Sequence, residues 1–353
     1  MNKNLAKQPS NRLIYLDILR IIAAFAVVMI HTTALYVTYI PDTEPFIEWG
    51  IYIFFNNSSR WAVPVFTMIS GSLFLDNNKT LKIRIFYKKN IFRIITAYIF
   101  WILIYALYNK PNSIEDLVEN AYHLWFLPML IGLYMITPIL RKITEDKKIT
   151  LYFLILSILF VIIFPTLFEF ELFKGFEVIY EQFTRGFCIK YSFYFIAGYY
   201  LANKNFSKKI TVLVYSLGII SLLMLPVLTI YSSLNNNKFY SNFMENFSIP
   251  VIFQSIFVFI LIKNICNKKH SNSKTNSKTN SKITKFIINL SKYTFGIYLV
   301  HVLILDILTD FGIIPIPCHV IISPLITNFL VFLISLLISA ILNHIPILKK
   351  YIV

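Results

Sequence analysis

The sequence has 353 residues, of which 57% are hydrophobic and only 14% are charged, and its mean hydropathy is +0.67. Soluble domains usually carry about a quarter of their residues as Asp, Glu, Lys or Arg, so the composition excludes a soluble enzyme or binding module. The formal net charge of +16 at pH 7 suits either nucleic acid or an anionic membrane surface as a partner, and the placement of the basic residues decides between them.

Apolar runs long enough to cross a bilayer recur along the whole chain. A helix needs roughly 20 apolar residues to cross the ~30 Å hydrocarbon core. We therefore predict an all-α, polytopic membrane protein that forms one domain over residues 1–353. About ten transmembrane helices are expected, at 13–37, 48–75, 85–108, 123–140, 150–168, 185–202, 210–231, 249–266, 283–308 and 321–346.

Lysine and arginine residues are concentrated in every second connection between these predicted spans. With the N-terminus in the cytoplasm, 25 of the 33 basic residues fall in cytoplasmic segments and three fall in outside loops. This asymmetry is typical of the positive-inside rule and predicts that both termini are cytoplasmic. The basic charge therefore reflects topology and contact with anionic lipid, and nucleic acid is not an expected partner.

The first predicted span carries three ionisable residues, Asp17, Arg20 and His31. Arg20 and His31 are 11 residues apart, which is about three helical turns and ~16 Å of rise, so they share one face of the helix. Asp17 precedes Arg20 by one turn and is placed to pair with it. Ionisable residues inside a span usually face the protein interior or a water-filled cavity and mark a functional site.

The second predicted span has a polar face. Asn56, Arg60, Thr67 and Gly71 follow one another at helical spacing, and Pro64 is expected to kink the helix. Such a face is tolerated in a membrane only where it lines a polar space.

Basic residues of the first three spans are expected to converge in the inner half of the membrane. Arg93 opens the third span from the inside, shortly after Lys89, and we predict that both lie near Arg20 and Arg60. Guanidinium groups clustered in a low dielectric bind phosphate or carboxylate groups well.

Histidines recur instead in the outer half of the predicted bundle. His31 lies toward the outer end of its span, His123 lies at the outer mouth of the fourth span beside Trp125, and His301 lies well up the ninth. A histidine with an ordinary pKa near ~6.5 suits the removal of a proton from a hydroxyl group. For His123 and His301, a structural hydrogen bond stands as the alternative to a role in catalysis or acceptor placement.

One segment differs from the rest of the chain in composition. The stretch "NKKHSNSKTNSKTNSKITK" at 267–285 consists of polar near-repeats, which cannot bury a core. We predict a flexible cytoplasmic loop here. The three cysteines, Cys188, Cys266 and Cys318, show no paired spacing, so neither redox chemistry nor a metal site is expected.

Several motifs in sequence order resemble the acyltransferase 3 family of integral membrane acyltransferases. The likeness is strongest to the short, membrane-only branch that includes O-acetyltransferases of enterobacterial common antigen. The motifs are "LDILRIIAAFAVVMIH", "RWAVPVFTMISGSLF", "KKNIFRIITAY", "HLWFLPMLIGLYMITPIL", "FYFIAGYYLA" and "YTFGIYLVH". Each alone is a loose hydrophobic pattern, and together they cover nearly the whole chain.

The resemblance implies an O-acetyltransferase in the bacterial plasma membrane, with acetyl-CoA or another short acyl-CoA as the cytoplasmic donor. The acceptor would be a hydroxyl group of a cell-surface glycan or a lipid-linked sugar. The implied catalytic residues are His31, Arg20 and Asp17. The family's donor-binding positions fall on Arg60, Arg93 and Lys89, although Lys89 stands where arginine is common and Thr96 where proline is common.

Two other functions remain open at the level of the residues. A polar, arginine-lined interior also suits a carrier for an amino acid or an anionic metabolite. A passive subunit of a surface-polymer assembly explains the topology but not the pairing of Arg20 with His31 on one helix face.

Overall fold

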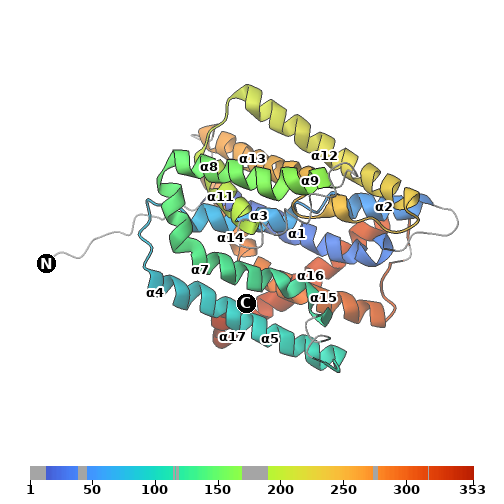
Figure 1. Cartoon of the computed structure of the whole chain (residues 1–353). Coiled ribbons are helices and arrows are strands. Elements are labelled where there is room, and N and C mark those ends of the chain that lie inside the picture. Colours follow the sequence, from blue (N-terminus) through green and yellow to red (C-terminus); the bar gives the residue numbers. More distant parts are fainter. Residues whose placement is uncertain are drawn as a thin grey trace.

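The computed structural model describes residues 13–38, 46–113, 116, 119–168, 190–272, 277–316 and 318–353. Almost all of these residues are helical, and no strand occurs among them. The long helices run roughly side by side as one bundle (Figure 1). The predicted all-α membrane architecture is confirmed.

Each predicted span corresponds to one helix or to a broken series of helices. In chain order these are α1 (Ile14–Val37), α2–α3 (Phe46–Asn57 and Ala62–Phe74), α4–η1–α5 (Ile83–Phe86, Tyr87–Ile91 and Phe92–Asn109), α7 (Phe126–Glu145), α8–η3–α9 (Lys147–Ser157, Ile158–Ile163 and Phe164–Phe168), α11 (Lys190–Asn203), α12 (Lys208–Asn235), α13 (Ile249–Asn272), α14–α15 (Ser277–Ser291 and Thr294–Asp310) and α16 (Ile322–His344). A short α17 (Pro346–Tyr351) follows.

Not all of these elements are long enough to cross a membrane by themselves. Within the part of the chain that is described, seven helices satisfy both length and apolarity, and the bent pair α14–α15 makes eight. The broken pair α2–α3 and the short α11 fall below that length, and residues 185–189 of the predicted sixth span lie outside the described residues. The count of ten spans stays a prediction.

The second span is interrupted by a turn at 58–61, between α2 and α3. Pro64 lies in the first turn of α3, where a missing N–H is tolerated, but its ring disfavours a helical residue four positions earlier, at Arg60. The predicted kink is therefore a full break that precedes the proline. This break places Arg60 on a turn instead of on a helix face.

Two glycines allow α3 and α11 to lie in backbone contact. A Cβ at Gly71 would come within 1.7 Å of the Phe195 carbonyl oxygen, and a Cβ at Gly198 within 2.0 Å of the Met68 oxygen. Small residues permit such close approach between helices in a membrane. The contact fixes α3, and with it the turn that carries Arg60.

The polar segment 267–285 is bordered by helices on both sides. α13 continues to Asn272, and α14 begins at Ser277 and meets α15 at a bend of 54°. Residues 273–276 lie outside the described residues. The backbone is thus helical over 267–272 and 277–285, and the flexible loop predicted there stays a prediction.

The connections rich in lysine and arginine gather at one end of the bundle, the end at which α1 begins. We call this the Arg20 end and the opposite one the His31 end. Lys263 Nζ donates to the carbonyl oxygens of Leu201 and Lys204 at 2.8 Å each, which ties α13 to the connection after α11. Asn77 Nδ2 donates to Thr144 Oγ1 at 3.1 Å, which ties the connection after α3 to the end of α7. The basic connections that alternate along the sequence therefore lie together at one end of the folded bundle (Figure 1).

Candidate active site

Asp17 and Arg20 form an ion pair at the Arg20 end of α1. Arg20 Nη1 lies 2.9 Å from Asp17 Oδ1, and the side chain of Asp17 is only 1% exposed while that of Arg20 is 27% exposed. Ser291 Oγ, at the end of α14, donates to the same carboxylate oxygen at 2.9 Å. The predicted pairing is confirmed. Asp17 holds one side of the Arg20 guanidinium group, and the rest of the Arg20 side chain is partly exposed.

Arg93, near the start of α5, lies on the other side of the α14–α15 bend. Its guanidinium carbon is 5.6 Å from the centre of the Phe295 ring, and Nη2 donates to the carbonyl oxygen of Val353. Phe295 is four residues beyond Ser291, across the bend, and Ser291 holds the carboxylate of the Arg20 pair. The bend therefore brings Arg20 and Arg93 into one region, as the sequence predicts.

The third basic residue expected here, Lys89, is exposed on the short π-helix η1, one turn before Arg93. It therefore lies at the same end of the bundle but on its surface. An exposed ammonium group is hydrated and screened by salt, whereas the part-buried Arg93 is less so.

Arg60 does not join this group, contrary to the prediction. Its Nε and Nη2 donate to Asn56 Oδ1 at 2.8 and 2.5 Å. Asn56 Nδ2 in turn donates to the Ile30 carbonyl oxygen and to Thr33 Oγ1 at 2.9 Å each. Because these α1 residues flank His31, Arg60 lies at the level of His31. The prediction placed Arg60 on a helix kinked at Pro64, and the turn at 58–61 instead changes the position of the side chain along the bundle axis.

The three histidines predicted for the outer half come together from three different spans. The ring centres of His31 and His301 are 5.0 Å apart, those of His123 and His301 are 5.3 Å apart, and those of His31 and His123 are 6.1 Å apart. His301 and His123 are 0% and 2% exposed, whereas His31 is half-buried. A substrate approaching this cluster would meet His31 first.

His31 is oriented by Tyr122, a residue that the sequence analysis did not select. The Tyr122 hydroxyl lies 3.1 Å from His31 Nδ1. Among the described residues Nε2 of His31 has no hydrogen-bond partner, so Nε2 is the nitrogen open to a substrate. When Nδ1 donates its proton to the tyrosine oxygen, Nε2 carries the lone pair that a base requires.

His301 is fixed in the same protonation pattern by its own helix. Its Nδ1 lies 2.7 Å from the Tyr298 carbonyl oxygen and 3.2 Å from that of Ile297. Carbonyl oxygens only accept, so Nδ1 carries the proton and Nε2 is an acceptor. Within the described structure this buried Nε2 has no partner, and neither has either ring nitrogen of His123. The cluster is therefore rich in unsatisfied acceptors and suited to a hydroxyl donor.

Tyrosines from two spans hold this cluster in place. Tyr298 donates from its hydroxyl to the His123 carbonyl oxygen at 2.6 Å. The Tyr105 hydroxyl donates to the Leu299 carbonyl oxygen at 3.1 Å and accepts from the Leu303 N–H at 3.0 Å, and its ring lies 5.0 Å from that of His123. Both tyrosines are buried, so the cluster has rigid walls.

Trp125 lies at the open side of the cluster. It is 43% exposed, and its ring centre is 5.7 Å from that of Tyr191. Tyr122, at 49% exposed, flanks the same opening. Trp125, which was predicted on the acceptor side, and Tyr122, which was not, thus form an aromatic rim beside the histidine cluster.

Comparison with protein families decides the class of this chain. A family model described as an acyltransferase domain, the acyltransferase 3 model, matches residues 13–344. The chain belongs to this family. It is a multi-pass membrane acyltransferase, and the expectation from its motifs is confirmed at that level.

Likeness to individual proteins is more limited. An alignment over 160 positions is 36% identical to an amino-acid racemase of Enterococcus faecalis, and it covers 42% of this chain and 21% of that protein. The chain therefore spans about a fifth of the length of this relative. No solved structure matches the chain.

Proposed function

We propose that this acyltransferase moves an acetyl group from cytoplasmic acetyl-CoA to a hydroxyl group of an envelope glycan in the bacterial plasma membrane, with both of its termini in the cytoplasm. The observation that carries the proposal is the division of α1 into two chemical regions. Arg20 is paired with Asp17 at one end, and His31 stands beside two buried histidines about 16 Å along the same helix.

The Arg20 end supplies the groups that a coenzyme A donor requires. Its phosphates are anionic, and guanidinium groups bind phosphate oxygens through charge-assisted hydrogen bonds. Arg20 is partly exposed and already oriented by Asp17, and Arg93 faces the same α14–α15 bend. The extended arm of coenzyme A then carries the thioester along α1 toward His31.

The His31 end supplies the base. The acceptor O–H gives its proton to His31 Nε2 while its oxygen forms a bond to the acyl carbon, and the C–S bond of the thioester breaks. The thiolate that leaves takes up the proton from His31, so the histidine is unchanged after each transfer. A brief acyl-histidine intermediate is the other route through the same nitrogen.

Labelled acetyl-CoA supplied to inside-out membrane vesicles tests the proposal. We expect the wild-type protein to transfer label to membrane or envelope material, and His31→Gln to abolish transfer. The matched control is His344→Gln, because His344 is exposed at the end of α16 and bonds only within its own helix. Absence of transfer by the wild type, together with uptake of an amino acid or anion that His31→Gln loses, would replace the enzyme with a carrier.

A further inference from the structure

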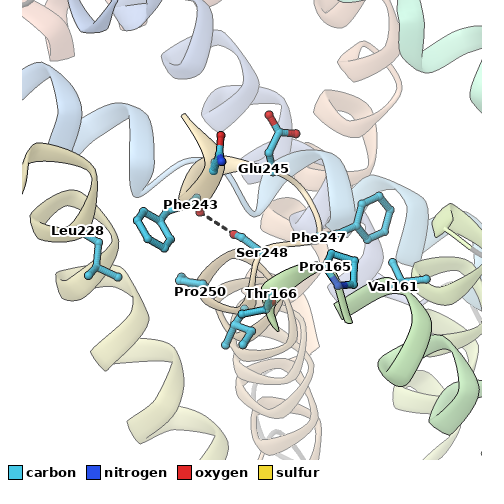
Figure 2. Close-up of a pocket in the computed structure, with 11 residues that line it drawn as sticks. Val161, Pro165, Thr166, Leu228, Phe243, Glu245, Phe247, Ser248 and Pro250 are labelled. Atoms are coloured by element: carbon cyan, nitrogen blue, oxygen red, sulfur yellow. Dashed lines mark hydrogen bonds between the residues drawn. The ribbon is translucent and has the colours of Figure 1, made fainter. Parts of the chain in front are cut away.

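A cavity of about 400 Å³ lies at the His31 end, away from the histidine cluster. Most of its lining is apolar, and Figure 2 shows how these side chains surround it. The apolar lining residues are Val161, Pro165, Leu228, Phe243, Phe247, Ile249 and Pro250.

The walls of this cavity belong to membrane-spanning segments. Val161 lies in the segment Lys147–Leu167, Leu228 in Lys208–Asn235, and Pro250 in Asn242–Asn267. Such segments lie in the hydrocarbon and interfacial layers of a bilayer. The neighbouring solvent is therefore lipid, and an apolar cavity of this kind is suited to a hydrocarbon chain.

Four of the lining residues are polar: Thr166, Asn242, Glu245 and Ser248. Glu245 is exposed at one margin of the cavity, across from Thr166 (Figure 2). The hydroxyl of Ser248 is already used, because it donates to the Phe243 carbonyl oxygen at 2.6 Å (Figure 2). A carboxylate accepts hydrogen bonds from hydroxyl groups and repels phosphate. Arg60 is the cation that acts on Glu245, and its guanidinium group is already bonded to Asn56 Oδ1. The margin therefore favours a neutral, hydroxyl-rich headgroup over a phospholipid headgroup.

An aromatic series connects the cavity with the histidine cluster. The ring of Phe247, a wall of the cavity, lies 4.8 Å from that of Tyr191, and Tyr191 lies 5.7 Å from Trp125. Asn246 Nδ2 donates to the Tyr191 hydroxyl at 3.0 Å and fixes this ring. Trp125 is two residues from His123. Packed aromatic side chains thus extend from the cavity to the segment that carries His123.

We propose that this cavity binds the hydrocarbon chain of the acyl acceptor, and that the acceptor is a neutral glycolipid held in the membrane. Its sugar headgroup passes Glu245 and lies along Tyr191 and Trp125, which brings a hydroxyl group to His31. This inference rests on the proposed function, because it names the class of acceptor for the transfer reaction.

Photo-crosslinking of the full-length protein in phosphatidylcholine vesicles tests the site. The probe is a glucosyl diacylglycerol with a diazirine in one acyl chain, and labelled peptides are identified by mass spectrometry. We expect labelling within 161–166 and 243–250. Leu228→Trp narrows the cavity and should lower this labelling about tenfold, the effect of losing the burial of about two methylene groups. Val227→Trp is the matched control, because Val227 is the preceding residue of α12 and is 56% exposed.

Four outcomes contradict the inference or the proposed function separately. Equal labelling in Leu228→Trp and wild type overturns the site, and equal labelling by a diazirine phosphatidylglycerol overturns the preference for a neutral headgroup. If Leu228→Trp transfers acetyl groups at the wild-type rate in an assay in which His31→Gln is inactive, the cavity does not bind the acceptor. The proposed acyltransferase function is then unaffected. Cavity labelling without any acetyl transfer by the wild type overturns the proposed function and leaves a lipid site.

Discussion

The two ends of α1 satisfy their polar groups in opposite ways. At the Arg20 end, the buried Asp17 carboxylate has both Arg20 and Ser291 as partners. At the His31 end, the buried nitrogens of His123 and one nitrogen of His301 have none within the described structure. Buried polar atoms without partners are rare in folded proteins. The first end pairs its buried carboxylate and leaves Arg20 partly exposed, and the second presents imidazole nitrogens that a hydroxyl group can reach.

This difference separates two tasks that a membrane acyltransferase has to perform. A preorganised cation binds an anionic donor without losing much side-chain entropy. Neutral imidazole rings held at fixed tautomers exchange protons with a hydroxyl group. Changes at the Arg20 end should therefore alter donor affinity, and changes at the His31 end should alter the rate of transfer.

The largest effect is expected for His31→Gln. Glutamine retains hydrogen-bonding capacity but has no acid–base chemistry near neutral pH, so the transfer rate should fall by about 10²–10⁴. Acetyl-CoA affinity, measured by equilibrium binding to the purified protein, should stay at the wild-type value. Near wild-type transfer by this variant would move the chemistry to His123 or His301.

Arg20→Ala and Arg93→Ala should act through donor binding instead. Removal of one charge-assisted phosphate contact costs about 1.5–3 kcal/mol, so acetyl-CoA affinity should fall about 10- to 150-fold in each variant. Arg84→Ala is the control at the same end, because Arg84 is exposed on α4. Membrane abundance of each variant, measured on a blot, separates lost binding from lost folding. Unchanged affinity in both variants would remove the donor site from this end.

The sequence predicts correctly the relative positions of residues that lie on the same helix. The spacing of Asp17, Arg20 and His31 on α1 depends only on helical geometry, and the ion pair of the first two is confirmed. The fold class also followed from apolar length and the distribution of charge. The sequence also predicts that the three histidines lie at a similar depth in separate spans, but their mutual contact is a finding of the structure.

Arg60 and Tyr122 show where this reasoning ends. The height of Arg60 depends on a turn at 58–61, which the apolar run conceals because it continues through the break. The role of Tyr122 depends on its approach to His31 from a residue 91 positions away, and a tyrosine beside a predicted histidine was the only signal in the sequence. Long-range packing decides both positions, and periodicity carries no information on it.

Tyr122→Phe should have a smaller effect than His31→Gln. It keeps the ring that lies 5.4 Å from His31 but removes the partner of Nδ1. A single net hydrogen bond contributes about 0.5–1.5 kcal/mol, so the maximal transfer rate should fall about 2- to 13-fold. Acetyl-CoA affinity should not change. Tyr87→Phe is the control, since its hydroxyl donates to the Met135 carbonyl oxygen at the Arg20 end. An equal loss of rate in both variants would deny Tyr122 a role in orienting His31.

The smallest effect is expected for Lys89→Ala, and it tests whether exposure or mere position determines the strength of a donor contact. Lys89 lies one turn from Arg93 but is exposed on η1. Exposed ion pairs contribute about 0–1 kcal/mol and are screened at high ionic strength, so acetyl-CoA affinity should fall less than about fivefold in low salt. The difference from wild type should disappear at 1 M salt, whereas the deficit of Arg93→Ala should persist because Arg93 is part-buried. If Lys89→Ala lost as much acetyl-CoA affinity as Arg93→Ala, and if that loss persisted at 1 M salt, this result would contradict the prediction. The donor would then lie over η1 and order the Lys89 side chain.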